Sequence, residues 1–162
     1  MDNVRVPYRG SHIDLSRADL DRVLRLMEPV AMGESYSTPE AMASIFRPML
    51  MGREQEHLAL ACFDNRMTLV GAEIVTIGTP SASMVPVGVV LRRALLMGGT
   101  RIAVAHNHPS GDPTPSQQDI DVTSRLGRAC MLIEMPLMDH MIITDGSWVS
   151  MSARGLLPWG MT

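Results

Sequence analysis

The sequence predicts a single α/β domain in which a mixed β-sheet is flanked by helices. The chain of 162 residues has the length of one domain, and its 46% hydrophobic and 19% charged residues are ordinary for a globular protein. Apolar runs typical of strands alternate along it with amphipathic segments typical of helices. Hairpins are expected at both ends of this series, so the sheet should contain parallel and antiparallel pairs.

The first 37 residues are predicted to be an N-terminal extension with one helix. Residues 1–14 are mixed in character and are expected to fray. Ser16 is a good N-cap, and apolar residues at helical spacing follow it, which predicts a helix over 17–28. The domain itself is expected to span residues 38–162.

The next elements are a helix and a hairpin. Ser37 or Thr38 can cap a helix that has Pro39 at its first position and runs to about Leu50. Two apolar runs then follow, EHLALACF and MTLVGAEIVTI, separated by the turn residues Asp-Asn-Arg. We read them as an antiparallel hairpin.

The remainder of the chain continues the alternation of helices and strands. Its predicted elements are a helix opened by Pro86 and ended by Gly98-Gly99, a buried strand RIAVAH, a loop NHPSGDPTP, a helix from Ser116 to about Cys130, and a hairpin turning at Asp145-Gly146.

Composition excludes several classes of function. The formal net charge is −3 and no basic arm or face stands out, so strong nucleic-acid binding is not expected. The longest uncharged run, Ile74 to Leu91, is broken by proline and glycine and predicts no membrane span. The N-terminus has neither an apolar core nor a cleavage-site pattern, and Cys62 and Cys130 lie in apolar stretches as free thiols would. A cytoplasmic location is therefore expected.

All 14 basic residues are arginine. No lysine can act as a base, a Schiff-base former or a phosphate clamp. Any chemistry must therefore use metal, carboxylate, hydroxyl and imidazole groups.

One stretch has the residues for such chemistry. His106 and His108 are two apart at the end of a predicted strand, so both imidazoles should lie on one face and can share a metal. Asp119 follows in the first turn of a helix, and the Pro/Gly-rich loop can bring its carboxylate back to them. Two nitrogens and one oxygen leave a fourth tetrahedral position open, as in hydrolytic zinc sites whose water has a pKa of about 7.

Each part of this pattern also has a structural explanation. A pair of histidines can be purely structural, and Ser116 with Asp119 fits a helix capping box. The complete string is much more specific than its parts. It reads H-x-H, seven residues, Ser, two residues and Asp, and it begins at the end of a β-type run.

This string resembles the JAMM (MPN+, JAB domain) metalloprotease motif, and the wording HNHPSGDPTPSQQD with DHMII further on is closest to the RadC-like branch. The resemblance covers about residues 38–157. It implies a cytidine-deaminase-like/MPN sheet, Zn²⁺ bound by His106, His108 and Asp119, and a role for Ser116 in polarising the scissile carbonyl. It also implies a distant glutamate that acts as general base and then acid.

Three residues can supply this glutamate. Glu56 opens the run EHLAL, which resembles the corresponding strand of the family, and is therefore preferred. Glu54 has the same strand parity, so periodicity cannot separate the two. Glu73 lies in the middle of the following strand and ranks third. His57 is expected to be structural, and Asp139-His140 has no assigned role.

Three functions remain open at this point. The leading hypothesis is a zinc-dependent hydrolase that cleaves a peptide or isopeptide bond in a protein or peptide substrate, with a ubiquitin-like modifier as one substrate implied by the resemblance. The second is a DNA-repair-associated RadC-like protein, although the three letters His-Asn-His do not make an HNH nuclease. The third is a non-catalytic MPN interaction module. A homodimer is left open.

Overall fold

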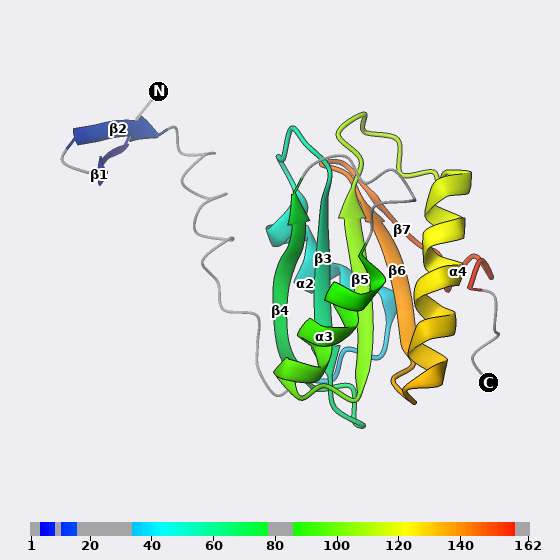
Figure 1. The fold of residues 1–162 in the computed structure, drawn as a ribbon. Coiled ribbons are helices and arrows are strands. Elements are labelled where there is room, and N and C mark those ends of the chain that lie inside the picture. The colour runs from blue at the N-terminus through cyan, green and yellow to red at the C-terminus, as the bar shows by residue number, and fades with distance from the viewer. Residues whose placement is uncertain (1–3, 9–10, 16–33, 78–85, 158–162) are drawn as a thin grey trace. The chain divides into compact units, whose positions relative to one another are not determined.

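The structure is a computed structural model that describes residues 4–8, 11–15, 34–77 and 86–157 (Figure 1). The chain forms two compact units, Met1–Val30 and Ala31–Thr162. The predicted boundary between an extension and a domain at residue 38 stays a prediction. The helix predicted over 17–28 lies outside the described residues.

The first unit contains a two-stranded antiparallel sheet of β1 (Val4–Tyr8) and β2 (Ser11–Leu15). The expectation that residues 1–14 fray is wrong for these strands. Their register places Arg5 opposite Asp14, between pairs of apolar residues. These two strands have five residues each, and period-two alternation over so few residues is a weak signal in a sequence.

The second unit is built on a five-stranded mixed sheet in the order β4-β3-β5-β6-β7. Its strands are β3 (His57–Phe63), β4 (Leu69–Ile77), β5 (Arg101–Asn107), β6 (Leu137–Ile143) and β7 (Trp148–Ser150). The pair β5·β6 is parallel and the other three pairs are antiparallel. The predicted mixed sheet, with hairpins β3-β4 and β6-β7 at its two ends, is confirmed.

Among the residues that the structure describes, three helices flank this sheet: α2 (Pro39–Leu50), α3 (Val87–Met97) and α4 (Gln117–Leu132). Figure 1 shows α3 and α4 on one side of the sheet and α2 on the other. The helix ends follow the local sequence. Thr38 accepts a hydrogen bond from the backbone of Ala41 at the start of α2, and Gly98 ends α3 in the left-handed conformation that glycine adopts without strain.

The side chains of the central strands alternate between the two faces of the sheet, and one set packs against α3 and α4. In β3, Leu58, Leu60 and Cys62 face the core that also contains Val90 and Ala94 of α3. The same core continues to β5 and α4 through Ile102, Val104, Val122, Leu126 and Cys130. None of the helices that the structure describes is both long and apolar enough to cross a bilayer.

Both cysteines are buried and unpaired, as predicted. Burial raises the pKa of each thiol to about 12, and for Cys62 the charge of Glu73 adds to the effect. Both thiols therefore stay protonated and act as small apolar core groups.

Candidate metal centre

The two histidines and the aspartate of the motif meet at the carboxyl end of β5. The Nε2 atoms of His106 and His108 lie 2.9 Å apart. Asp119 places Oδ1 3.0 Å from Nε2 of His106 and Oδ2 3.5 Å from Nε2 of His108. One potential ligand atom from each residue lies within 4.8 Å of the others, as three ligands of one metal ion do. The predicted convergence of these three side chains is confirmed.

The start of α4 positions Asp119 by a reciprocal capping box. Ser116 Oγ accepts a hydrogen bond from the backbone N–H of Asp119 (3.2 Å), and Asp119 Oδ2 accepts one from the backbone N–H of Ser116 (2.7 Å). The hydroxyl of Ser116 also donates to the same carboxylate oxygen (2.7 Å). The capping box that the sequence suggested is therefore present, and it holds the Asp119 carboxylate beside the two histidine rings.

The hydrogen-bond partner of His108 determines which ring nitrogen is free. Nδ1 of His108 lies 2.8 Å from the backbone carbonyl oxygen of Asp112. A carbonyl can only accept, so Nδ1 carries a proton, and in the neutral ring the lone pair of Nε2 points toward His106 and Asp119. Two imidazole nitrogens and a carboxylate aimed at one place fit a divalent transition metal such as zinc, without fixing which metal it is.

The electrostatics of the site also favour a cation. The hydrogen bond with Asp119 is the largest effect on the pKa of His108 and raises it against the opposing effect of burial. The Asp112 carbonyl and the charges of Asp119 and Glu56 raise it further. For Asp119, burial raises the pKa, but the hydrogen bonds from His106, His108 and Ser116 and the charge of His106 outweigh it and hold the pKa below its ordinary value. The carboxylate therefore stays ionised beside the two rings.

Sheet pairing brings Glu56 to the same end of β5. Strand β3 runs antiparallel to β5 with Leu58 opposite His106, so the residue just before β3 lies beside the histidines. Glu56 is half-buried there, and its charge acts on His108. The Glu56 carboxylate is thus in electrostatic reach of the metal ligands.

The other two candidate glutamates are placed differently. Glu54 is exposed on the loop before β3. Glu73 lies opposite Leu60 in the middle of β4 and pairs with Arg93 of α3 at 3.3 Å. The structure therefore separates Glu56 from Glu54 where strand parity could not.

Asn107, between the two histidines, faces the segment that carries Glu56. Its Oδ1 accepts a hydrogen bond from the backbone N–H of His57 (2.7 Å), and its Nδ2 donates to the carbonyls of Gln55 (3.0 Å) and Arg53 (3.3 Å). Successive residues of a strand point to opposite faces. The rings of His106 and His108 therefore lie on one face of the end of β5, and the Asn107 amide lies on the other. His57, expected to be structural, is buried and places its own Nδ1 2.7 Å from the carbonyl of Gln55.

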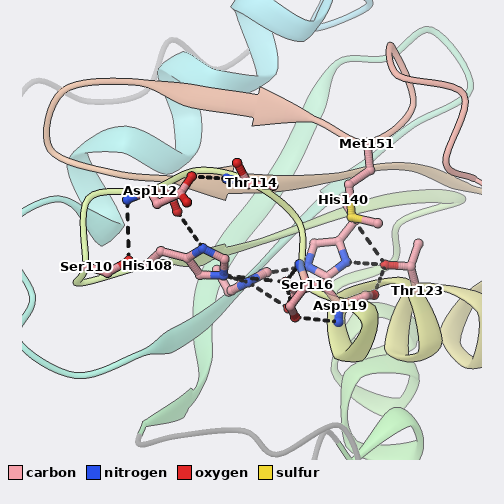
Figure 2. A network of polar contacts seen from close by, with 10 residues as sticks. His108, Ser110, Asp112, Thr114, Ser116, Asp119, Thr123, His140 and Met151 are labelled. Carbon is pink, nitrogen blue, oxygen red and sulfur yellow. Dashed lines mark hydrogen bonds and ion pairs between the residues drawn. The ribbon is translucent and has the colours of Figure 1, made fainter.

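Two further residues contact the candidate ligands: His140, which the sequence analysis named without assigning a role, and Thr123, which it did not name. His140 of β6 places Nε2 2.8 Å from Nδ1 of His106, and Thr123 of α4 lies 2.6 Å from the other nitrogen of His140 (Figure 2). Burial lowers the pKa of His140 to about 3, with the neighbouring histidine charges adding to it against the charge of Asp119, so its ring is neutral. The only sequence signal for His140 was the Asp-His pair in DHMII, and Thr123 had none.

Asp139 serves a different part of the fold. Its carboxylate accepts hydrogen bonds from the hydroxyl of Ser150 and the backbone N–H of Ser152. It therefore ties β6 to β7 and to the turn that follows, and burial raises its pKa despite these bonds.

A pocket opens beside His108, on the side where β6 and the end of α2 meet the motif loop. Its lining consists of Leu50, Gly52, Arg53, Asn107, His108, Pro109, Gly111, Ile143, Thr144 and Asp145. A molecule bound in this pocket would contact both the loop that follows β5 and the segment before β3.

The part of the chain that contains these residues is similar to a known protein family. A sequence model of the family described as "RadC-like JAB domain" matches residues 36–156 of this chain. Those residues include all three metal-site side chains and Glu56, Ser116, Thr123 and His140.

Several curated proteins are similar over most of the chain. A UPF0758 protein of Xanthomonas campestris is 38% identical over 133 residues, which are 82% of this chain and 59% of that protein. A UPF0758 protein of Roseiflexus castenholzii is 38% identical over 119 residues (74% and 51%), and one of Shouchella clausii is 34% identical over 143 residues (88% and 60%). The chain thus matches between about half and three-fifths of the length of these relatives, and their names state no activity.

Proposed function

Because this chain belongs to the family of RadC-like JAB domains, we propose that it is a zinc-dependent hydrolase that cleaves a peptide or isopeptide bond. The observation that carries the proposal is the convergence of two imidazole Nε2 atoms and the Asp119 carboxylate, with Glu56 in reach of them. The names of the relatives support the broader RadC-like reading more directly than they support hydrolysis. The proposed reaction therefore rests on the geometry of the site.

His106, His108 and Asp119 would hold the ion. When bound, it would supply a Lewis acid for a substrate carbonyl and would lower the pKa of a water molecule in the site. Three protein ligands leave a position for that chemistry, as in other catalytic zinc sites.

The proton transfers are assigned to Glu56. Its carboxylate would accept a proton from the attacking water and return it to the leaving amine, which is the role of a general base followed by a general acid. The position suits this role because the carboxylate is half-buried and close enough to the candidate ligands for its charge to act on His108.

Ser116 is proposed to stabilise the charge that develops on the carbonyl oxygen. Its hydroxyl is held 2.7 Å from Asp119 Oδ2 and so lies at the edge of the metal site. To act in this way the hydroxyl would turn its single proton from the Asp119 carboxylate to the substrate oxygen.

The substrate is proposed to be a protein or a peptide, and a ubiquitin-like modifier is the specific class to test first. The pocket beside His108 provides a surface for residues next to the scissile bond. A gene for a ubiquitin-like protein or an activating enzyme next to the gene for this chain would support that class.

The test combines metal content with cleavage. The purified protein is loaded with Zn²⁺ and incubated with a peptide library containing α-linked and lysine ε-linked members, and products are identified by mass spectrometry. We expect cleavage by the wild type, retention of zinc but loss of cleavage in Glu56→Gln, and loss of zinc in His108→Ala. Glu54→Gln is the matched control, two residues away and exposed, and should behave as wild type.

Two results would refute the hydrolase. One is the absence of zinc binding by the wild-type protein. The other is a Glu56→Gln variant as active as the wild type on every member that is cleaved. A salt-dependent gel shift with tight DNA binding, or magnesium-dependent nicking, would instead support the DNA-repair-associated alternative.

A further inference from the structure

His106 is held from behind by a second, deeply buried histidine. Nδ1 of His106 lies 2.8 Å from Nε2 of His140, and the two ring centroids are 4.9 Å apart. Only 1% of His140 is exposed to solvent. A polar group buried this deeply is costly unless both of its nitrogens have partners, so the second nitrogen must also be bonded.

That second partner is Thr123 on α4. Its hydroxyl oxygen lies 2.6 Å from Nδ1 of His140 and 2.6 Å from the backbone carbonyl oxygen of Asp119. Thr123 is fully buried. The chain of contacts therefore begins at the backbone of one metal-site residue and ends at the ring of another.

Counting hydrogens along this chain gives one consistent arrangement. The carbonyl of Asp119 can only accept, so the single hydroxyl proton of Thr123 is donated to it. The hydroxyl must then accept from Nδ1–H of His140, because two acceptors would otherwise face each other at 2.6 Å. The Met151 sulfur, 3.5 Å from the hydroxyl, is a weak acceptor and does not change this order.

The same logic continues to the metal ligand. A neutral His140 with its proton on Nδ1 presents a bare Nε2, which must accept from Nδ1–H of His106. With a proton fixed on Nδ1, the nitrogen of His106 that can offer a lone pair to a metal is Nε2, the atom that faces His108 and Asp119. Figure 2 draws Thr123, His140 and Asp119 together, with dashed lines joining Thr123 to the other two.

We propose that Thr123 and His140 are positioning residues that fix the Nδ1–H tautomer of His106 and so present its Nε2 lone pair to the metal. The inference deepens the proposed function, because it concerns the same metal site, but it does not depend on which reaction the site performs. Outer partners of this kind orient a ligating histidine and raise its basicity.

The two ligand histidines are thus fixed by different means. His108 donates Nδ1–H directly to the Asp112 carbonyl in an exposed loop. His106 depends on two side chains from β6 and α4, and a change at Thr123 alters the end of the relay without touching the ligand. This separation makes Thr123 the most informative position to change.

The experiment compares Thr123→Val, which has nearly the same shape but no hydroxyl, with Thr123→Ser, which keeps the hydroxyl. Zn²⁺ affinity is measured by competition with a chromogenic chelator. We expect Thr123→Val to lower the affinity roughly 10–100-fold, the usual effect of losing an outer partner, and Thr123→Ser to remain close to wild type. Thermal unfolding of the metal-free variants reports whether each is folded.

A second measurement needs no variant. In metal-free wild-type protein with ¹⁵N-labelled histidine, NMR chemical shifts distinguish a protonated from a bare ring nitrogen. We expect His140 to be protonated on Nδ1 and bare on Nε2, and His106 to carry a proton on Nδ1. In folded Thr123→Val the His140 tautomer should no longer be unique.

The outcomes separate this inference from the proposed function. Protonation of His140 on Nε2 in the wild type, or wild-type zinc affinity in folded Thr123→Val, overturns the relay even if the protein cleaves peptides. Zinc binding that weakens as expected in Thr123→Val, in a protein that cleaves no peptide, supports the relay and counts against the hydrolase.

Discussion

The side-chain oxygen of Asn107 accepts a 2.7 Å hydrogen bond from the backbone N–H of His57. Together with the two bonds that the Asn107 amide donates to Gln55 and Arg53, it binds the middle residue of the His-Asn-His triplet to the segment on both sides of Glu56. Asn107 is 3% exposed, so these bonds are shielded from water. The proposed general base and the candidate metal ligands are thereby joined by buried hydrogen bonds.

Asn107→Ala is expected to lower kcat while zinc content stays at the wild-type level. The segment carrying Glu56 loses its anchor, and a misplacement worth about 1.4 kcal/mol in the transition state is a tenfold loss of rate. Rates are measured on a peptide that the wild type cleaves, beside metal analysis of the same samples.

Asn107→Asp provides the matched control for this prediction. An aspartate can still accept from His57 but cannot donate to Gln55, so it should recover little of the lost rate. A wild-type kcat in Asn107→Ala would show that the segment before β3 holds its position without the amide.

Substitutions at Ser116 should separate helix capping from catalysis. Ser116→Ala removes the N-cap of α4 and is expected to cost roughly 0.5–2 kcal/mol of unfolding free energy. Ser116→Asn supplies an equally good cap and should restore most of that stability, measured by urea unfolding of metal-free protein. If Ser116 acts on the substrate, Ser116→Asn stays impaired in cleavage, and wild-type cleavage by this variant would confine Ser116 to the cap.

Asp64 is expected to make the free energy of unfolding fall as the pH is lowered into the acid range. Its Oδ1 accepts backbone hydrogen bonds from Arg66 (2.8 Å) and Thr68 (2.9 Å) in the β3-β4 turn. The bond from Thr68 is the largest effect, and the bonds outweigh desolvation to hold the pKa below its ordinary 3.8. A depressed carboxyl pKa stabilises the fold above pH 3.8, and this stabilisation is lost as the pH falls through the native pKa.

The measurement compares the unfolding free energies of wild type and Asp64→Ala across the acid range. The variant should be less stable at neutral pH, and the difference should shrink as the pH falls below 3.8. A difference that stays constant with pH would mean that the Asp64 charge is not what holds the turn.

Gly99→Ala is expected to destabilise the protein, although Gly99 does not need a positive φ. A Cβ at this position would lie 2.7 Å from Cβ of Cys62 and 3.4 Å from its Cα, so β3 would have to shift. Overpacking of this kind typically costs about 1–3 kcal/mol. Gly88→Ala in α3 is the control, because its Cβ meets nothing within 4 Å and should leave stability unchanged or raised by up to about 1 kcal/mol. Equal stability of the two variants would contradict the predicted clash.

Local signals predict the elements of this fold better than their arrangement. Thr38 and Ser116 begin helices and Gly98 ends one, because caps act within a few residues of chain. The strand order is decided by long-range packing, so the parallel pairing of β5 with β6 could not be read from the apolar runs that make them strands.

In the candidate site, too, local sequence predicts some features and long-range packing decides the others. The spacing of His106, His108 and Asp119 predicts the ligand set because a strand end and a helix start have fixed geometries. Glu54 and Glu56 share one parity, and only the sheet register separates them. Thr123 and His140 are 17 residues apart on different elements, and nothing local to either one signals their contact.

The parallel neighbour of β5 has a consequence for how the protein matures. His140 comes from β6, which follows the three candidate ligands His106, His108 and Asp119 in the chain. A nascent chain that has reached the end of α4 already contains His106, His108 and Asp119 but lacks the strand that supports the first of them. If the proposed relay holds, tight binding of an ion would wait for β6 to dock beside β5, and a metal would be captured late, by chains whose central sheet is already assembled.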